Sequence, residues 1–325
     1  MDFASEQPKF LQLLIGIAAF GVVVAALLVF IDRAPKRGQE KWQIVGFLGP
    51  ALLLLTIGLV IPAIRTTILS FQNGQSTGWV GPDNYTWMFS QTEALHVLRN
   101  TLIWLLLVPT VATGIGLLYA ILIDRARLEW FAKSLVFMPM AISFVGAGII
   151  WKFVYAYRGG EDAEQIGLLN QIVVWFGGEP RQWLLNPPVN TLFLIVVMIW
   201  TEAGLAMVVL SAAIKAIPSD IVEAARIDGT NAWQMFSRVT LPSIRPALVV
   251  ILVTISIATL KVFDIVRTMT GGQFDTSVVA NEMYNQAFRF GQTGRGSALA
   301  VFLFVLVLPI VVYQIRNLRL QREGR

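Results

Sequence analysis

The stretch TLFLIVVMIWTEAGLAMVVLSAAI occupies residues 191–214 and carries a single charged side chain, Glu202. A membrane core is crossed by about 20 apolar residues in helical form, because backbone groups without hydrogen-bond partners are too costly in lipid. This stretch is long and apolar enough to meet that requirement. It predicts a transmembrane helix.

Six other stretches have a similar composition. The predicted spans are residues 10–31, 44–64, 102–123, 135–154, 191–214, 247–265 and 298–315. Of the 325 residues, 56% are hydrophobic and 14% are charged, whereas a typical soluble domain carries about 25% charged residues. The sequence therefore predicts an all-α, polytopic membrane protein with about seven transmembrane helices. It excludes a soluble enzyme, a nucleic-acid-binding protein and a disordered chain.

The distribution of basic residues predicts the orientation in the membrane. Fifteen of the 25 Lys and Arg residues lie in four polar segments, 32–43, 124–133, 213–246 and 316–325. Basic residues concentrate in cytoplasmic loops, so we expect these segments to be cytoplasmic. With seven spans, the N-terminus then lies outside the plasma (inner) membrane and the C-terminus lies in the cytoplasm. The first span has only Lys9 before it and is interpreted as a retained anchor helix.

The same patterns predict three regions. Residues 1–43 form an anchor helix and a cytoplasmic linker, residues 44–316 form a transmembrane domain that contains the polar loop 213–246, and residues 317–325 form a cytoplasmic tail. The chain has no cysteine and one histidine, His96, and it contains no phosphate-binding glycine loop. We therefore expect no catalytic residue, no metal site and no cofactor bound by this chain.

The loop at residues 217–246, IPSDIVEAARIDGTNAWQMFSRVTLPSIRP, is too polar to cross the membrane but is strongly patterned. Ser219 or Asp220 can cap a short helix, and Asp220 stands three residues before Glu223, as in a capping box. Gly229 suits the left-handed position that follows a helix.

A second helix is expected to follow in the same loop. Asn231 stands three residues before Gln234 and can cap it, and Leu241-Pro242 is expected to end it. From the residues alone, two interpretations remain: an amphipathic loop resting on lipid headgroups, or a helical element that contacts a partner.

The pattern EAA-x-x-DG at residues 223–229, followed by Phe236, Val239, Leu241-Pro242 and Pro246, resembles the cytoplasmic loop of permease subunits of binding-protein-dependent ABC importers. In that family the loop docks in a cleft on the ATPase subunit. The resemblance implies that the coupling residues here are Glu223, Ala224, Ala225, Asp228 and Gly229.

Further motifs over residues 42–316 resemble maltose-type carbohydrate permeases, most of all the alpha-glucoside-like branch. These are Val80-Gly81 with Asn84-Tyr85, Asn100-Thr101, Pro139, Trp151, Phe263-Asp264 and Thr270-Gly271-Gly272. Gln273 stands where the family usually has Gly or Pro.

That resemblance implies an import subunit that forms the path for a sugar, an alpha-glucoside or another oligosaccharide, and that is not itself an enzyme. The implied partners are an external solute-binding protein, a second permease subunit in a heterodimer, and two cytoplasmic ATPase subunits that hold ATP and Mg. Membrane lipid surrounds the spans, and no nucleic acid is expected.

Charged residues inside spans are costly and mark function by default. Glu202, Lys261 and Asp264 are the three conspicuous ones, because Lys152 lies near a span end and can reach the interface. Lys261 and Asp264 are spaced to pair on one helical face. Glu202 is expected either to pair with Lys261 or to accept hydrogen bonds from sugar hydroxyls. The resemblance places the substrate path at Ala147, Thr201, Glu202, Leu205, Thr259 and Val262, with Trp200 and Phe263 offering aromatic faces.

Two other functions compete with the importer subunit. A self-contained, proton-coupled secondary transporter would use Glu202 and Asp264 as proton sites, but it leaves the patterned polar loop unexplained. A membrane anchor or sensor without transport has little need for charges in the middle of the bilayer.

Overall fold

The structure is a computed structural model that describes residues 3–32, 39–123, 128–159 and 164–323. Within these residues the chain is helical, and an isolated bridge between Gln72 and Trp79 is the only strand-like pairing. The predicted all-α fold is confirmed. The chain divides into two compact units, Met1–Thr66 and Thr67–Arg325, which are described separately.

The first unit consists of α1 (Phe3–Asp32), α2 (Gln39–Leu55) and most of α3 (Ile61–Leu69), with a π-helical turn between the last two. Helices α1 and α2 pack against each other. The predicted spans 10–31 and 44–64 fall in these helices. The predicted linker falls partly on residues 33–38, which lie outside the described residues.

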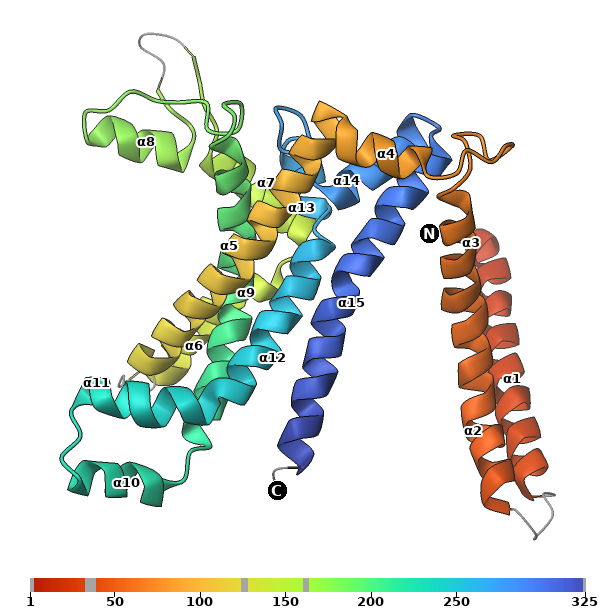
Figure 1. Cartoon of the computed structure of the whole chain (residues 1–325), viewed down its shortest axis with the longest axis horizontal. Coiled ribbons are helices and arrows are strands. Elements are labelled where there is room, and N and C mark those ends of the chain that lie inside the picture. The colour runs from red at the N-terminus through yellow and green to blue at the C-terminus, as the bar shows by residue number, and fades with distance from the viewer. Residues whose placement is uncertain (1–2, 33–38, 124–127, 160–163, 324–325) are drawn as a thin grey trace. The chain divides into compact units, whose positions relative to one another are not determined.

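The second unit contains α4 (Asp83–Ser90), α5 (Thr92–Ile123), α6 (Glu129–Phe137), α7 (Phe144–Val154), α8 (Leu168–Trp175), α9 (Asn190–Lys215), α10 (Ser219–Ile227), α11 (Ala232–Gln234), α12 (Leu241–Leu260), α13 (Asp264–Met269), α14 (Val279–Tyr284) and α15 (Thr293–Glu323). Figure 1 shows α10 and α11 at one end of the long helices of this unit and α4, α8 and α14 at the opposite end. We call these the foot end and the far end.

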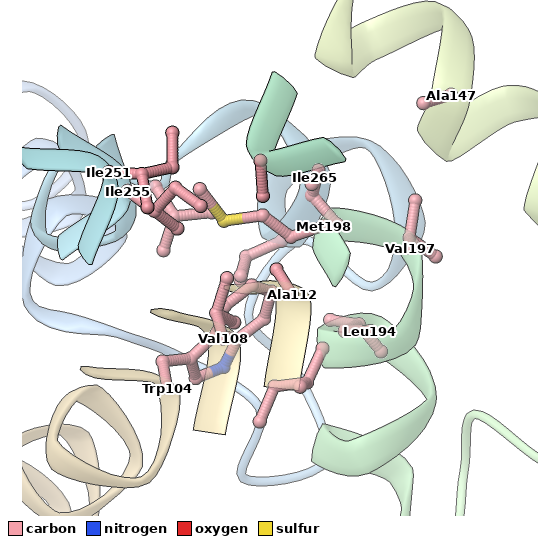
Figure 2. Packing of buried hydrophobic residues seen from close by; sticks show 14 of the residues in the cluster. Trp104, Val108, Ala112, Ala147, Leu194, Val197, Met198, Ile251, Ile255 and Ile265 are labelled. Carbon is pink, nitrogen blue, oxygen red and sulfur yellow. The ribbon is translucent and has the colours of Figure 1, made fainter. Parts of the chain in front are cut away.

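The centre of the second unit is the packing of α5 against α9 and α12. Trp104, Val108 and Ala112 are fully buried on one face of α5, at the four-residue spacing that aligns side chains along a helix. Figure 2 shows this row beside Leu194 and Met198 of α9, with Ile251 and Ile255 of α12 close by. On the opposite face, leucines of α5 are exposed, as suits a helix that borders lipid.

Small residues allow α5 and α9 to approach closely. Gly116 continues the buried row of α5 between Ala112 and Ala120. A Cβ atom added at Gly116 would lie 2.5 Å from the Cβ of Ala206 and 2.7 Å from the backbone nitrogen of Met207. Close contact of this kind is a main source of helix association in membranes, because lipid supplies no hydrophobic drive between apolar helices.

The fourth predicted span, 135–154, is not one straight helix. The segments Glu129–Ala141 and Phe144–Val154 are bent by 103° at a break of a few residues. Pro139 lies in a 3-10 turn, and the side chain of Ser143 caps α7 by accepting a hydrogen bond from the backbone nitrogen of Gly146 at 3.1 Å. The capping bond and the proline explain a bend that hydropathy does not register.

The predicted boundaries of the sixth span, 247–265, differ from those of the helix in the structure. Its apolar helix runs over Ala232–Leu260 and stops before Lys261, and Asp264 begins the separate short helix α13. The other three predicted spans of this unit lie within longer helices. In the described residues five helices are long and apolar enough to cross a membrane, and the bent pair makes a sixth. A seventh span within α1 stays a prediction.

A second, smaller core at the far end joins α4, α5, α14 and α15. Its buried members are Met88, Val97, Val279, Ala298 and Leu299. This core fixes α15 against the start of α5, whereas many side chains farther along α15, such as Phe304 and Val312, are exposed.

Candidate functional site

The foot, residues 219–240, begins with the short helix α10. Its end is a Schellman motif. The backbone nitrogen of Thr230 donates to the backbone oxygen of Ala225 at 3.2 Å, and the backbone nitrogen of Gly229 donates to the backbone oxygen of Arg226 at 3.0 Å. Gly229 has φ +75°, which side chains with a β carbon resist. The predicted role of Gly229 in ending the helix is confirmed.

The start of α10 differs from the prediction. Pro218 is the N-cap residue, and no side chain caps the helix. The capping box predicted from Asp220 and Glu223 is therefore not formed. Because helix α10 already begins at Ser219, both residues lie inside the helix, where the Asp220 side chain cannot take the N-cap geometry.

The second arm of the foot begins with Asn231, the predicted cap, which forms a capping box with Gln234. The side chain of Asn231 accepts a hydrogen bond from the Gln234 backbone at 2.8 Å, and the Gln234 side chain accepts one from the Asn231 backbone at 2.9 Å. This arm does not end at Leu241-Pro242, as predicted, but continues through the π-helical turn Met235–Thr240 into α12. Pro242 has no N–H to donate, and it lies just after the π-helical turn, where the hydrogen-bond pattern of the continuing helix changes.

The foot presents its signature residues to the outside. Glu223, Ala224, Asp228 and Gly229 are exposed, and Ala225 is half-buried. Beside them, Ile227 and Trp233 are 86% and 72% exposed. Carboxylates and large apolar side chains together form a surface suited to protein contact.

The predicted path residues of α9 lie where that helix is enclosed on every side. The four consecutive residues Thr201, Glu202, Ala203 and Gly204 are all buried. Glu202 is 9% exposed, and the part of the chain that the structure describes offers its carboxylate no hydrogen bond or ion pair within range. The hydroxyl of Thr201 donates to the backbone oxygen of Met198 at 2.9 Å. Of these four residues, Glu202 alone brings an uncommitted polar group.

Three other predicted path residues belong to the large apolar cluster of this unit: Ala147 and Val262 are buried in it, and Leu205 packs against it from α9. Thr259 is buried, and its hydroxyl donates to the backbone oxygen of Ile255 at 2.7 Å. Phe263 turns toward Tyr284 instead, with ring centroids 5.3 Å apart. The structure thus places Ala147, Leu205 and Val262 in one extended apolar cluster, and the ring of Phe263 against Tyr284.

The expected geometry of Lys261 and Asp264 is absent. Helix α12 ends at Leu260 and α13 begins at Asp264, so the two residues do not share one helical face. Lys261 is exposed, and among the described residues no ion pair joins it to Asp264 or to Glu202. The break in the helix removes the spacing on which the expected pairing depended.

Aromatic side chains line the far-end half of α9. Trp200 meets Trp151 of α7 edge-on at 5.7 Å, and Trp151 contacts Tyr155 at 5.2 Å. The indole nitrogen of Trp151 is buried without a hydrogen-bond partner in the described residues. The aromatic face expected at Trp200 therefore belongs to a ring cluster, and that cluster includes one free donor.

Buried asparagines at the far end hold the loop between α13 and α14, which sequence reasoning did not anticipate. Asn100 of α5 donates to the backbone oxygens of Asp275 and Ser277, and Asn190 of α9 donates to that of Phe274 at 2.7 Å. Phe274 and Asp275 both have left-handed φ values, 55° and 56°. Polar residues at the predicted span ends were visible in the sequence, but their common target was not.

No three His, Cys, Asp or Glu side chains gather as a metal site in the described ranges. The fold and the foot define the class of protein: a polytopic helical membrane subunit with a structured polar element at one end.

Comparison with known proteins identifies the family. The model of the "binding-protein-dependent transport system inner membrane component" family matches residues 97–322. The chain is 49% identical over 86% of its length to the osmoprotective compounds uptake permease protein GgtC of Synechocystis, all of which is covered. It is 48% identical over the same share to the alpha-glucoside transport system permease protein AglF of Rhizobium meliloti, 83% of which is covered. The chain belongs to this family of inner-membrane components.

Solved structures show the same fold. A chain of a bacterial ABC transporter that imports the acidic polysaccharide alginate is similar with a TM-score of 0.74 and 24% identity, over 87% of this chain and 98% of that chain. A chain of a bacterial alginate ABC transporter in complex with an alginate pentasaccharide-bound periplasmic protein matches with a TM-score of 0.73 and 24% identity, over 86% of this chain and 94% of that chain.

The family membership decides between the functions that the sequence left open. The chain is a multi-pass inner-membrane permease subunit of an ABC importer, and it is a transport subunit rather than an enzyme. The self-contained secondary transporter and the simple membrane anchor are not supported.

Proposed function

We propose that this permease subunit forms the path for a sugar, an alpha-glucoside or a related oligosaccharide, delivered by an external solute-binding protein. The proposal is supported by AglF, the relative named for alpha-glucoside transport, at 48% identity. The observation that carries the coupling part of the proposal is the foot, whose exposed Glu223 and Asp228 lie beside exposed Ile227.

We propose that the foot contacts an ATPase subunit. ATP and Mg would then be held by two such partner subunits and not by this chain. Carboxylates on the foot can pair with basic groups on the ATPase, while Ile227 and Trp233 fill apolar pockets. A second permease subunit, in a heterodimer, would complete the enclosure of the path.

The proposed orientation places the foot end in the cytoplasm, the N-terminus outside and the C-terminus inside. Lys215, Arg226 and Arg238 at the foot end support it. A reporter fused after Arg325 should give the cytoplasmic signal, and one inserted at Gly178, in the loop after α8, should give the opposite signal. Equal signals at both positions would contradict the orientation.

Within the path, we propose that Glu202 accepts hydrogen bonds from sugar hydroxyls. The carboxylate is buried in the middle of α9 and lacks a partner among the described residues. Burying a charged group inside the membrane costs free energy, and such groups therefore mark functional sites. Lys261, the alternative partner, is exposed beyond the end of α12. The exposure of Lys261 favours substrate contact over ion pairing.

The test is reconstitution of the whole importer in lipid vesicles. With the binding protein, both permeases and the ATPases present, radiolabelled maltose, trehalose or sucrose should enter only when ATP is supplied. Vesicles that hold this chain alone should not accumulate these sugars under an imposed proton gradient. Uptake by the chain alone would contradict the proposal, and ATP-driven uptake restricted to a compound other than a sugar would contradict its substrate class.

A further inference from the structure

A group of polar side chains joins the root of the foot to α6. Glu129, the first residue of α6, accepts a hydrogen bond from the Nζ of Lys133 at 2.7 Å and a second from the Nζ of Lys215. Lys133 also donates to the hydroxyl of Ser211. One carboxylate therefore connects a lysine of its own helix with a lysine at the end of α9.

The partners show how α6 lies on α9. Near its other end, α6 meets α9 at Gly204, where an added Cβ would lie 2.5 Å from the backbone oxygen of Val136 and 2.9 Å from the Cα of Phe137. As the α6 residue number rises from 129 to 137, that of its α9 partner falls from 215 to 204, so the helices run antiparallel. Helix α6 is held on α9 by backbone contact at one end and by the bonds of Glu129 and Lys133 toward the other.

Lys215 occupies a special position in the chain. It is the last residue of α9, and Pro218, the N-cap of α10, follows after two residues. A displacement of the foot acts on the membrane helices through this short connection and through α12, into which the second arm continues. Glu129 is therefore bonded to one of the two points at which movement of the foot would enter the membrane helices.

From α6 the contacts continue toward the predicted path. After the bend, α7 carries Ala147, and Gly148 next to it packs on α13, where an added Cβ would lie 3.1 Å from the Cβ of Thr268. A continuous line of packed elements thus runs from the root of the foot through Glu129, α6 and α7 to α13.

We propose that Glu129 is a positioning residue that makes α6, and the bent segment behind it, move together with the foot. The inference rests on the proposed function of the foot as the ATPase contact. Without Glu129, α6 keeps its contact at Gly204 and the bond from Lys133 to Ser211, but it loses its bond to Lys215 at the root of the foot. Movement of the foot then reaches the path mainly through α9 and α12, the two helices that continue into the foot. Because Glu129 and Lys215 are partly exposed, with side chains 30% and 52% accessible, their loss should cost little folding stability.

The experiment uses the complete importer in vesicles and measures two quantities for each variant: maltose taken up per ATP hydrolysed, and membrane abundance. Glu129→Ala should lower the uptake per ATP by roughly fivefold, the low end of common coupling effects, at normal abundance. Lys215→Met should act in the same direction, and the double variant should be no worse than Glu129→Ala alone. Glu179→Gln, at an exposed carboxylate in the loop after α8, is the matched control and should match the wild type.

A distance measurement separates positioning from simple stabilisation. The sequence has no cysteine, so Ser134→Cys on α6 and Ser219→Cys on α10 can be spin-labelled specifically in this chain, which is then assembled with its partner subunits. With Glu129 present, the distance between the labels should stay narrow when ATP is added. With Glu129→Ala, the distribution should broaden or shift between the two nucleotide states.

The possible outcomes distinguish the two proposals. If Glu223→Lys abolishes ATPase stimulation while Glu129→Ala leaves both the uptake ratio and the label distance unchanged, the role of Glu129 is overturned and the foot contact stands. A fall in abundance with an unchanged uptake ratio and distance also overturns it, because Glu129 is then only a stabilising group. If Glu223→Lys has no effect, the proposed foot contact itself fails.

Discussion

The foot and the middle of α9 are organised in opposite ways. Every bond that shapes the foot joins residues a few positions apart, such as Gly229 with Arg226 and Asn231 with Gln234. The middle of α9 depends instead on neighbours far along the chain, because Gly204 meets α6 and Ala206 meets Gly116 of α5. The foot exposes its signature residues, whereas α9 buries four residues in succession, from Thr201 to Gly204.

The contrast shows that the two regions tolerate change differently. A substitution on the foot should leave the membrane helices packed and affect only what the foot contacts. A substitution in the middle of α9 or α5 should disturb packing first. The variants below separate these effects, from the largest expected change to the smallest.

The largest effect is expected at the foot. Gly229→Val forces a β-branched residue into a left-handed conformation, and Glu223→Lys reverses the charge of an exposed carboxylate. Both variants should reach the membrane at normal levels and lose stimulation of ATP hydrolysis by the loaded binding protein. Gly177→Val is the control, because Gly177 has φ +76° and open space around it but lies after α8. Equal loss in Gly177→Val would show that backbone strain alone is responsible.

The next effect tests packing between α5 and α9. Gly116→Val places methyl groups where the backbone of Met207 already lies within 2.7 Å of an added Cβ. Overpacking of this kind costs about 1–3 kcal/mol, which should lower membrane abundance several-fold. Gly114→Val, on the exposed side of the same helix with nothing within 4 Å, should leave abundance unchanged on immunoblots.

Glu202→Gln tests the buried carboxylate. If Glu202 contacts the sugar, uptake should fall by roughly tenfold at normal abundance, because a hydrogen bond to a charged group contributes about 1.5–3 kcal/mol. Binding of sugar to the external receptor should be unchanged. If Glu202 pairs with Lys261 in another state of the importer, abundance should fall and Lys261→Met should restore it. Wild-type uptake and abundance would reject both roles.

The smallest effect is expected from a single cap. Asn231→Ala removes the side-chain acceptor of the capping box, which is worth about 1 kcal/mol, and should lower ATPase stimulation by a few-fold. Ser219→Ala should have no effect of this kind, because the side chain of Ser219 caps no helix. A loss in Ser219→Ala equal to that in Asn231→Ala would contradict the observed start of α10.

Hydropathy located the membrane helices in the sequence but did not predict where they bend or end. The stretch 135–154 reads as one apolar segment, yet Ser143 caps a new helix within it and the segment turns by 103°. The stretch 247–265 also reads as one apolar segment, although α12 ends within it at Leu260. Apolar content measures compatibility with lipid and carries no information about the direction of the helix axis.

Hydrogen bonds between residues far apart in the sequence were not predicted either. Asn100 and Asn190 could be recognised as polar residues near span ends, but that both donate to the loop at Phe274 and Asp275 follows only from the packing of α5 beside α9. Glu129 and Lys215 also look like ordinary charged residues at helix ends. Their bond exists because α6 lies antiparallel on α9.

The sequence by itself determined the class of fold, the foot and the family, because long apolar stretches and short motifs act through neighbouring residues. The two arms of the foot follow from Gly229 and from the Asn231–Gln234 spacing, whose hydrogen bonds close within one helical turn. Only the tertiary structure decided which faces of the spans meet, where Lys261 and Asp264 separate, and which residues surround Glu202. Helices that are apolar on all sides can pack in many ways, and the choice depends on close contacts such as that between Gly116 and Ala206, which form only when distant segments come together.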